Sequence, residues 1–305
     1  MIERYKPIKT NYFNNTKIVN RFHTLDDLKK QIQVGELGDN KEVFTYIDFK
    51  SSDMGLLNTT ISQFEIVVMD AIYTLSLHGR RVFTADMVAN VIAGKEVGNN
   101  KDKSTRFNDI TKAIEKLLSM RIKIDFSEIA RELDFKDIPD IETKVSDYML
   151  PLMEITIKSK VKKIDKTCYV LKNTPILYRY AEYMGRVVSV PSSLLAIPDS
   201  REDILFTILK RELIKEISLM KNKKNNYKSR TITYEWNDGE IRRGLFERIG
   251  LRKEDYANDG QWRKKKSKVN TMIKQIMTHL INEKYIKGFS FNKSSGAIVG
   301  FDVQI

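Results

Sequence analysis

Five cations stand within six consecutive residues of the C-terminal third of the chain: Arg263, Lys264, Lys265, Lys266 and Lys268. Lysine ammonium groups act as point charges that neutralise phosphate, whereas a guanidinium can bind the edge of guanine through two hydrogen bonds. We therefore predict that the four lysines contact a phosphate backbone. Arg263 is predicted to contact a guanine.

A helix is predicted directly after this basic run. Its apolar positions recur at helical spacing and form one face: Val269, Met272, Ile273, Ile276, Met277 and Leu280. Asn270 and Lys274 lie one turn apart on the polar side, where we expect them to reach base edges. Trp262 is predicted to pack the helix entrance against the core. His279 is predicted to be structural.

A hairpin is predicted from Ile286 to Val303, with its tip at residues 292–296, where Gly296 can take a positive φ. Lys293 in this tip is expected to touch the DNA backbone or the minor groove. A basic helix followed by a two-stranded ribbon is the order of a recognition helix and wing. The pattern thus indicates a protein that docks on phosphate and lays a helix into a groove of DNA.

A second set of polar residues repeats this arrangement at a constant offset of 162 residues. Its members occupy a predicted helix in the first half of the chain: Lys101, Lys103, Arg106, Asn108 and Lys112. They are predicted to contact DNA in the same way. A solvated helix face is an equally good interpretation of this set.

Net charge supports an anionic partner for the last third of the chain. The formal net charge is +13, and residues 201–305 hold 23 Lys and Arg against 13 Asp and Glu. Most of the positive surplus is therefore local, which is typical of a nucleic-acid-binding region.

Catalytic and metal-binding patterns are missing from the sequence. The three histidines, His23, His78 and His279, are far apart, and Cys168 is the only cysteine and is expected to be a core residue. No glycine-rich phosphate-binding loop or nucleophile elbow occurs. We predict no catalytic residue, no metal and no cofactor, and a protein that is not an enzyme.

The elements before the basic helix predict the fold. A capping box at Ser62–Glu65 opens a long helix, and helices follow at residues 85–92 and 104–120. Residues 122–126 are predicted as a first wing strand, residues 134–147 as irregular, and residues 155–171 as a hairpin.

The second half of the chain repeats the order of long helix, short helix, basic helix and ribbon. A long helix is predicted at residues 202–220, a strand at 231–236 and a helix at 240–249. The predicted fold class is α+β, with two tandem winged-helix domains and an N-terminal arm. The predicted boundaries are 1–58 for the arm, 59–198 for the first domain (with an insertion at about 125–150) and 199–305 for the second. A strand is expected in the arm at residues 42–49.

Hydropathy predicts a cytoplasmic protein that does not contact membranes. No stretch approaches the roughly 18–20 apolar residues that span a bilayer, and the N-terminus lacks the apolar run of a signal peptide.

Residues 61–303 resemble plasmid replication initiators of the tandem winged-helix type. Three segments carry the resemblance: Ile61–Glu65, Pro175–Glu182 before Val188–Pro191, and Leu280–Phe289. The resemblance implies a protein that binds repeated sites in double-stranded DNA at an origin, helps open an adjacent AT-rich region and recruits host helicase or initiator proteins. It also implies a homodimer that represses its own promoter and a monomer that initiates replication.

Two other function classes stay open at the level of sequence. A transcriptional regulator would use the same DNA-reading elements, and loss of its gene would change a promoter but not the copy number of an element. A metal-dependent nuclease or recombinase would use scattered acidic residues, and it would nick supercoiled plasmid in the presence of a divalent metal.

Overall fold

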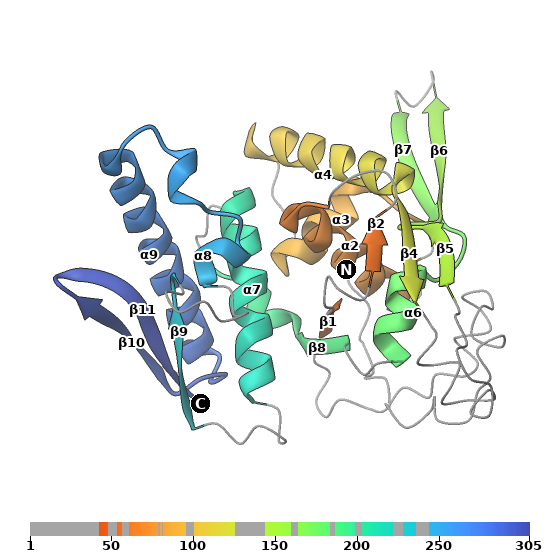
Figure 1. Cartoon of the computed structure of the whole chain (residues 1–305). Helices are drawn as coiled ribbons and strands as arrows, with labels where there is room; N and C mark the ends of the chain where they lie inside the picture. The colour runs from red at the N-terminus through yellow and green to blue at the C-terminus, as the bar shows by residue number, and fades with distance from the viewer. Residues whose placement is uncertain are drawn as a thin grey trace. The chain divides into compact units, whose positions relative to one another are not determined.

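The computed structural model is a mixed α+β protein with small antiparallel sheets, and it divides into two compact units, Met1–Ser192 and Ser193–Ile305 (Figure 1). The structure describes residues 43–47, 54–56, 61–78, 80, 82–95, 101–125, 144–159, 164–183, 187–198, 203–221, 228–235 and 244–305.

Three helices form the core of the first unit: α2 (Gln63–Leu77), α3 (Ala85–Ala93) and α4 (Lys101–Ser119), each of which contacts the other two. The predicted capping box is confirmed, because Ser62 Oγ accepts the Glu65 N–H at 3.3 Å and Glu65 Oε2 accepts the Ser62 N–H at 2.6 Å. Glu65 also binds Lys116 Nζ of α4 at 2.8 Å. One carboxylate thus begins α2 and joins it to α4.

A hairpin of β6 (Leu152–Ser159) and β7 (Ile164–Leu171) packs beside these helices. Strand β7 also pairs with β3 (Val82–Phe83), so the sheet order is β3-β7-β6. Phe83 lies opposite Tyr169 in the register, and their ring centroids are 5.9 Å apart. The hairpin predicted at residues 155–171 is confirmed, and Cys168 is buried in β7 as expected.

The segment between α4 and β6 forms a separate sheet. Strand β4 (Arg121–Asp125) pairs with β2 (Met54–Leu56) and with β5 (Lys144–Tyr148). The strand predicted at residues 122–126 is confirmed for residues 122–125, and it pairs with β2 and β5 instead of joining the β6–β7 hairpin. The irregular structure predicted through residue 147 is wrong from Lys144 onward. This error has a physical cause, since strand partners far away in sequence leave no local signal.

Two described strands of the predicted N-terminal arm pair with later parts of the first unit. Strand β1 (Val43–Ile47) confirms the predicted strand and pairs with β8 (Val187–Pro191), while β2 pairs with β4. Helix α6 (Ile176–Tyr183) precedes β8, and a short 3-10 helix, η4 (Ser192–Leu195), follows it.

The second unit continues with α7 (Ile204–Met220), β9 (Ser229–Thr233), α8 (Leu245–Arg248) and the 3-10 helix η5 (Lys253–Asp255). The side chain of Asp203 accepts the Phe206 N–H at 2.8 Å and so begins α7. Helix α8 is shorter than the predicted helix at 240–249, whose residues 240–243 lie outside the described residues. Gly244 caps α8 at a place where an added Cβ would lie 2.4 Å from the carbonyl oxygen of Tyr234.

The chain then forms α9 (Asp259–Asn282) and a hairpin of β10 (Gly288–Ser294) and β11 (Ala297–Gln304). The predicted turn is confirmed, with φ of 48° at Ser295 and 77° at Gly296. Strand β11 also pairs with β9, which gives the sheet order β10-β11-β9. Gly300 of β11 passes close to β9, since an added Cβ would lie 2.5 Å from the carbonyl oxygen of Ile232.

A partly buried ionic network joins α8 and β9 to α7. Glu216 of α7 binds Arg248 of α8 at 2.8 Å and Arg230 of β9 at 3.2 Å. Glu212, one turn earlier, binds Lys215 at 3.0 Å and lies 3.7 Å from Arg248. Burial raises the pKa of Glu212, but Lys215, Arg211 and Arg248 together hold this pKa below its ordinary value.

The two units share one order of elements and one sheet topology. Each has a long helix, a short strand, a short helix, a second long helix and a hairpin, and in each the last hairpin strand lies at the centre of a three-stranded sheet. In the first unit β4 and β5 interrupt this order between α4 and the hairpin.

Candidate functional site

Helix α9 carries the predicted site and has a well-defined start. Asn258 Oδ1 accepts the Gln261 N–H at 3.0 Å, and Gln261 Oε1 accepts the Ala257 N–H at 3.3 Å. The basic run therefore lies inside the helix, from its fifth residue onward, and its side chains follow the helical period. At about 100° per residue, five neighbouring cations cannot share one face.

The five cations of the run have different surroundings. Arg263 and Lys264 are exposed, whereas Lys265 and Lys266 are half-buried. Lys266 Nζ lies 5.6 Å from the centroid of the Trp262 ring, a cation–π distance.

Lys268 has an ionic partner inside the second unit. Its Nζ lies 2.8 Å from Asp203 Oδ2 at the start of α7. Burial raises the pKa of Asp203, but the hydrogen bond from Lys268 and the N–H of Phe206 bring it below the ordinary value. Contact between Lys268 and an external phosphate would compete with this ion pair, so Lys268 is less available than the sequence suggests.

Four polar side chains spaced by four, three and four residues lie along one line of α9: Arg263, Ser267, Asn270 and Lys274. We call this set the α9 stripe. Arg263, Ser267 and Lys274 are exposed, and Asn270 is half-buried. Another face of the same helix buries Val269, Ile273 and Ile276 completely, and half-buried Asn270 lies at the border between the two faces. The stripe therefore presents two cations, a hydroxyl and an amide on the solvent side of a helix that is anchored along its length.

Ser267, together with Thr271 and Thr278 on the same exposed side, was missed by reasoning from the sequence. Thr271 Oγ1 donates to Ser267 O at 3.2 Å. The signal was present, because these residues recur at intervals of three or four with Arg263 and Lys274.

Asn270 is held by the aromatic core of the second unit. Its amide oxygen accepts a hydrogen bond from the Tyr234 hydroxyl at 2.5 Å. Tyr234 packs on Phe246 with ring centroids 4.5 Å apart, and Phe246 meets Trp262 at 5.4 Å. The prediction that Trp262 packs the helix entrance against the core is confirmed, since it is 5% exposed.

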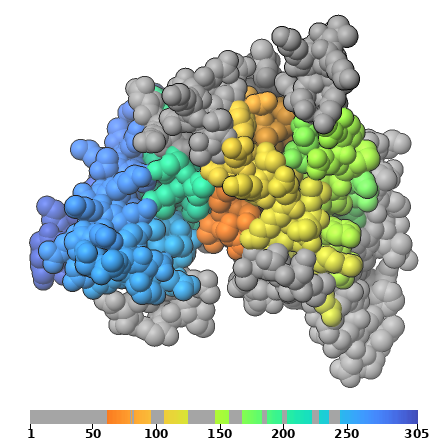
Figure 2. Space-filling view, turned by 90° about the horizontal axis from the view of Figure 1, so that it is seen from above, coloured from red at the N-terminus to blue at the C-terminus, as the bar shows by residue number. Residues whose placement is uncertain are grey.

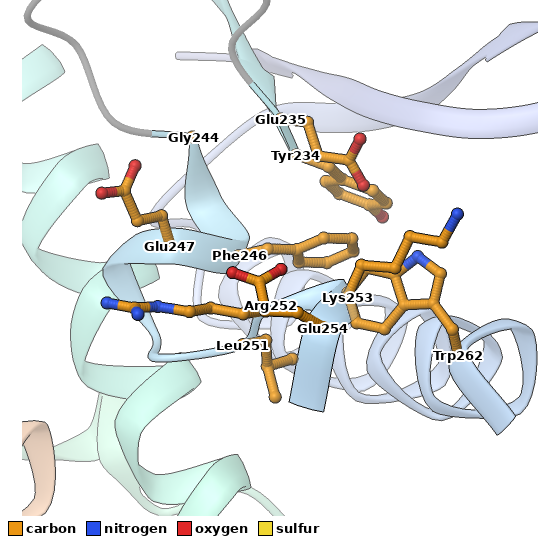
Figure 3. Close-up of a pocket in the computed structure, with 10 residues that line it drawn as sticks. All are labelled: Tyr234, Glu235, Gly244, Phe246, Glu247, Leu251, Arg252, Lys253, Glu254 and Trp262. Atoms are coloured by element: carbon orange, nitrogen blue, oxygen red, sulfur yellow. The ribbon is translucent and has the colours of Figure 1, made fainter. Parts of the chain in front are cut away.

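A pocket of about 300 Å³ opens beside these three rings. Figure 3 shows the rings together, with Lys253 in front of Trp262 and Arg252 extended toward Glu247. In the space-filling view the segment from α8 to the start of α9, in blue, lies at the surface of the second unit (Figure 2).

Lys293 is exposed near the end of β10, just after a break in the β10–β11 register. His279 is buried, and its Nε2 lies 2.9 Å from Ser193 O, in agreement with the predicted structural role.

The corresponding residues of the first unit lie on α4. Asn108 and Lys112 are exposed one turn apart, as Asn270 and Lys274 are spaced on α9, and Arg106 is half-buried. The side chains of Lys101 and Lys103 lie outside the described residues, although both positions fall in the first turn of α4.

Among the described residues no group of three His, Cys, Asp or Glu side chains could hold a metal ion. No helix in the described parts of the chain is long and apolar enough to cross a membrane. Comparison with protein-family models, with curated proteins and with solved structures finds no match to this chain.

Proposed function

We propose that this chain is a sequence-specific double-stranded DNA-binding protein whose second unit is a winged-helix domain with α9 as its recognition helix. The observation that carries the proposal is the α9 stripe, which presents two cations and a hydroxyl on the exposed side of a long helix, together with the half-buried amide of Asn270. An α-helix of this kind fits the major groove, where base edges show distinct donor and acceptor patterns.

The arrangement of the elements around α9 supports the proposal. The order α7, β9, α8, α9, β10 and β11, with β11 at the centre of the sheet, is the order of helices, strands and hairpin in a winged helix. Lys293 then lies near the tip of the wing, in a position to meet backbone phosphate. By the same reasoning the first unit is a second winged helix, with α4 as its recognition helix.

The function that fits two such units best is initiation of replication on a plasmid or another mobile element. Two linked DNA-reading units gain affinity when their half-sites are correctly spaced, which suits repeated sequences at an origin. Host helicase or initiator proteins are the proposed partners, and bond-making chemistry is not part of the proposed role.

A selection experiment tests DNA binding directly. The full chain is mixed with a random double-stranded library at about 150 mM salt, and bound duplexes are enriched and sequenced. We expect a repeated motif whose affinity falls steeply with salt, because contacts to phosphate release counterions. Equal affinity for every duplex would overturn the proposal.

A plasmid assay then tests initiation. The selected sequence and the gene are placed on a plasmid without another origin, and its maintenance is measured. We expect maintenance that is lost with the Lys264→Ala/Lys274→Ala variant. Sequence-specific binding without maintenance would refute initiation and favour a transcriptional regulator.

A further inference from the structure

The hydrogen bond between Tyr234 and Asn270 has a defined direction. Tyr234 is 2% exposed, so its hydroxyl proton needs an acceptor within the protein. The amide oxygen of Asn270 supplies that acceptor. If the amide were reversed, its nitrogen would donate to the hydroxyl oxygen, and the tyrosine proton would lose this acceptor in a buried site.

Ionisation of Tyr234 does not change the direction of this hydrogen bond. Burial raises the pKa of Tyr234 far above its ordinary value of 10.0. The hydroxyl therefore stays protonated at neutral pH and remains a donor there. Packing on Phe246 and Phe301, with centroid distances of 4.5 and 6.3 Å, fixes the ring that carries it.

Asn270 is consequently left with its amide nitrogen for an external partner. An asparagine that reads adenine uses both ends of the amide, since it accepts from N6 and donates to N7. At position 270 the oxygen accepts from Tyr234, which uses one of its two lone pairs and turns the oxygen toward a hydroxyl whose residue is 2% exposed. The two N–H groups can still donate, and guanine presents two acceptors, O6 and N7, side by side in the major groove.

We infer that Tyr234 is a positioning residue that makes Asn270 a hydrogen-bond donor, so that the α9 stripe selects guanine, and not adenine, at the base pair opposite Asn270. This inference rests on the proposed DNA-binding function and adds a base preference to it. The preference arises from Tyr234, a buried residue that directly follows β9. Tyr234 does not itself touch DNA.

The test compares base preferences among variants in selections from a random duplex library. Tyr234→Phe removes only the hydroxyl and frees the Asn270 oxygen. We expect guanine preference at one position to fall on the order of tenfold, with adenine gaining, while the other positions keep their preferences. Tyr285→Phe is the matched control, because it removes a hydroxyl that contacts Ser218 at 2.8 Å in the same unit. It should leave every preference unchanged.

Asn270→Asp supplies a second test that keeps the acceptor for Tyr234. A carboxylate has no N–H groups, so the guanine preference should be lost at the same position and cytosine, whose N4 is a donor, should be enriched. Thermal unfolding of each variant separates a change in preference from a change in folding. The Asp variant keeps the test decisive if the Phe variant is unstable.

The outcomes separate this inference from the proposed function. If the wild-type chain enriches no sequence, the DNA-binding proposal itself fails. If the wild-type chain enriches a motif but Tyr234→Phe and Asn270→Asp select the same motif, only the role of Tyr234 and Asn270 is refuted. Enrichment of adenine by the wild-type chain at the position that Asn270→Asp alters would also refute it.

Discussion

Removing two exposed lysines of α9 should change the salt dependence of DNA binding by a calculable amount. Lys264 and Lys274 both lie on the exposed side of the helix. Each phosphate contact contributes about 0.9 to the slope of log K against log salt. The Lys264→Ala/Lys274→Ala variant should therefore have a slope lower by about 1.8. Between 50 and 200 mM salt, the affinity ratio of wild type to variant should shrink about tenfold.

Fluorescence anisotropy with a labelled duplex of the selected sequence measures this slope at four or more salt concentrations. Lys228→Ala/Lys287→Ala is the charge-matched control, since both residues are exposed in the second unit and lie outside α9. We expect its slope to stay within about half a unit of the wild-type value, because generic charge loss acts weakly across a screened surface. Equal slopes for the two double variants would show that the lysines of α9 contribute no more to DNA binding than other exposed lysines do.

Three further predictions concern stability. Gly300→Ala should lower the free energy of unfolding by about 1–3 kcal/mol in a denaturant titration, because its Cβ would lie 2.5 Å from Ile232 O; an unchanged midpoint would contradict this close approach. Glu212 has a lowered pKa, so its stabilising contribution is present above the ordinary carboxyl range and is lost as the pH falls through the folded-state value. The free energy of unfolding, measured from pH 7 to 3, should therefore fall less steeply in Glu212→Gln than in the wild type. Parallel curves for the two proteins would show that ionisation of Glu212 does not stabilise the fold. Ser62→Ala should lower the free energy of unfolding by about 1 kcal/mol, because the helix cap is lost. Ser62→Asp should retain most of the stability that the cap contributes.

Local features of the fold could be predicted from the sequence. The capping box at Ser62, the apolar face from Val269 to Leu280 and the turn at Gly296 each depend on residues a few positions apart. Helical period and backbone preference act over that range, so the beginning of α2 and the β10–β11 hairpin are confirmed.

Long-range features could not be predicted in this way. Strand β4 pairs with β2 and β5, and the partner of Lys268 is Asp203, 65 residues earlier. Tyr234 and Asn270 are 36 residues apart and carry no shared local pattern. The sequence therefore indicated which helix carries the charge. Only the three-dimensional arrangement showed that Lys268 has an intramolecular partner and that Tyr234 holds Asn270.

The topology of the β10-β11-β9 sheet has a kinetic consequence. Strands β10 and β11 meet across a two-residue turn, whereas Thr231 of β9 binds Asp302 of β11 across 71 residues. The turn between β10 and β11 closes with little loss of chain entropy. Pairing of β9 with β11 closes a much longer loop, which contains α8 and α9, and so loses more chain entropy. Refolding of the second unit should therefore be limited by the arrival of β9 at an already formed hairpin, and α9 gains its full support only at that late step.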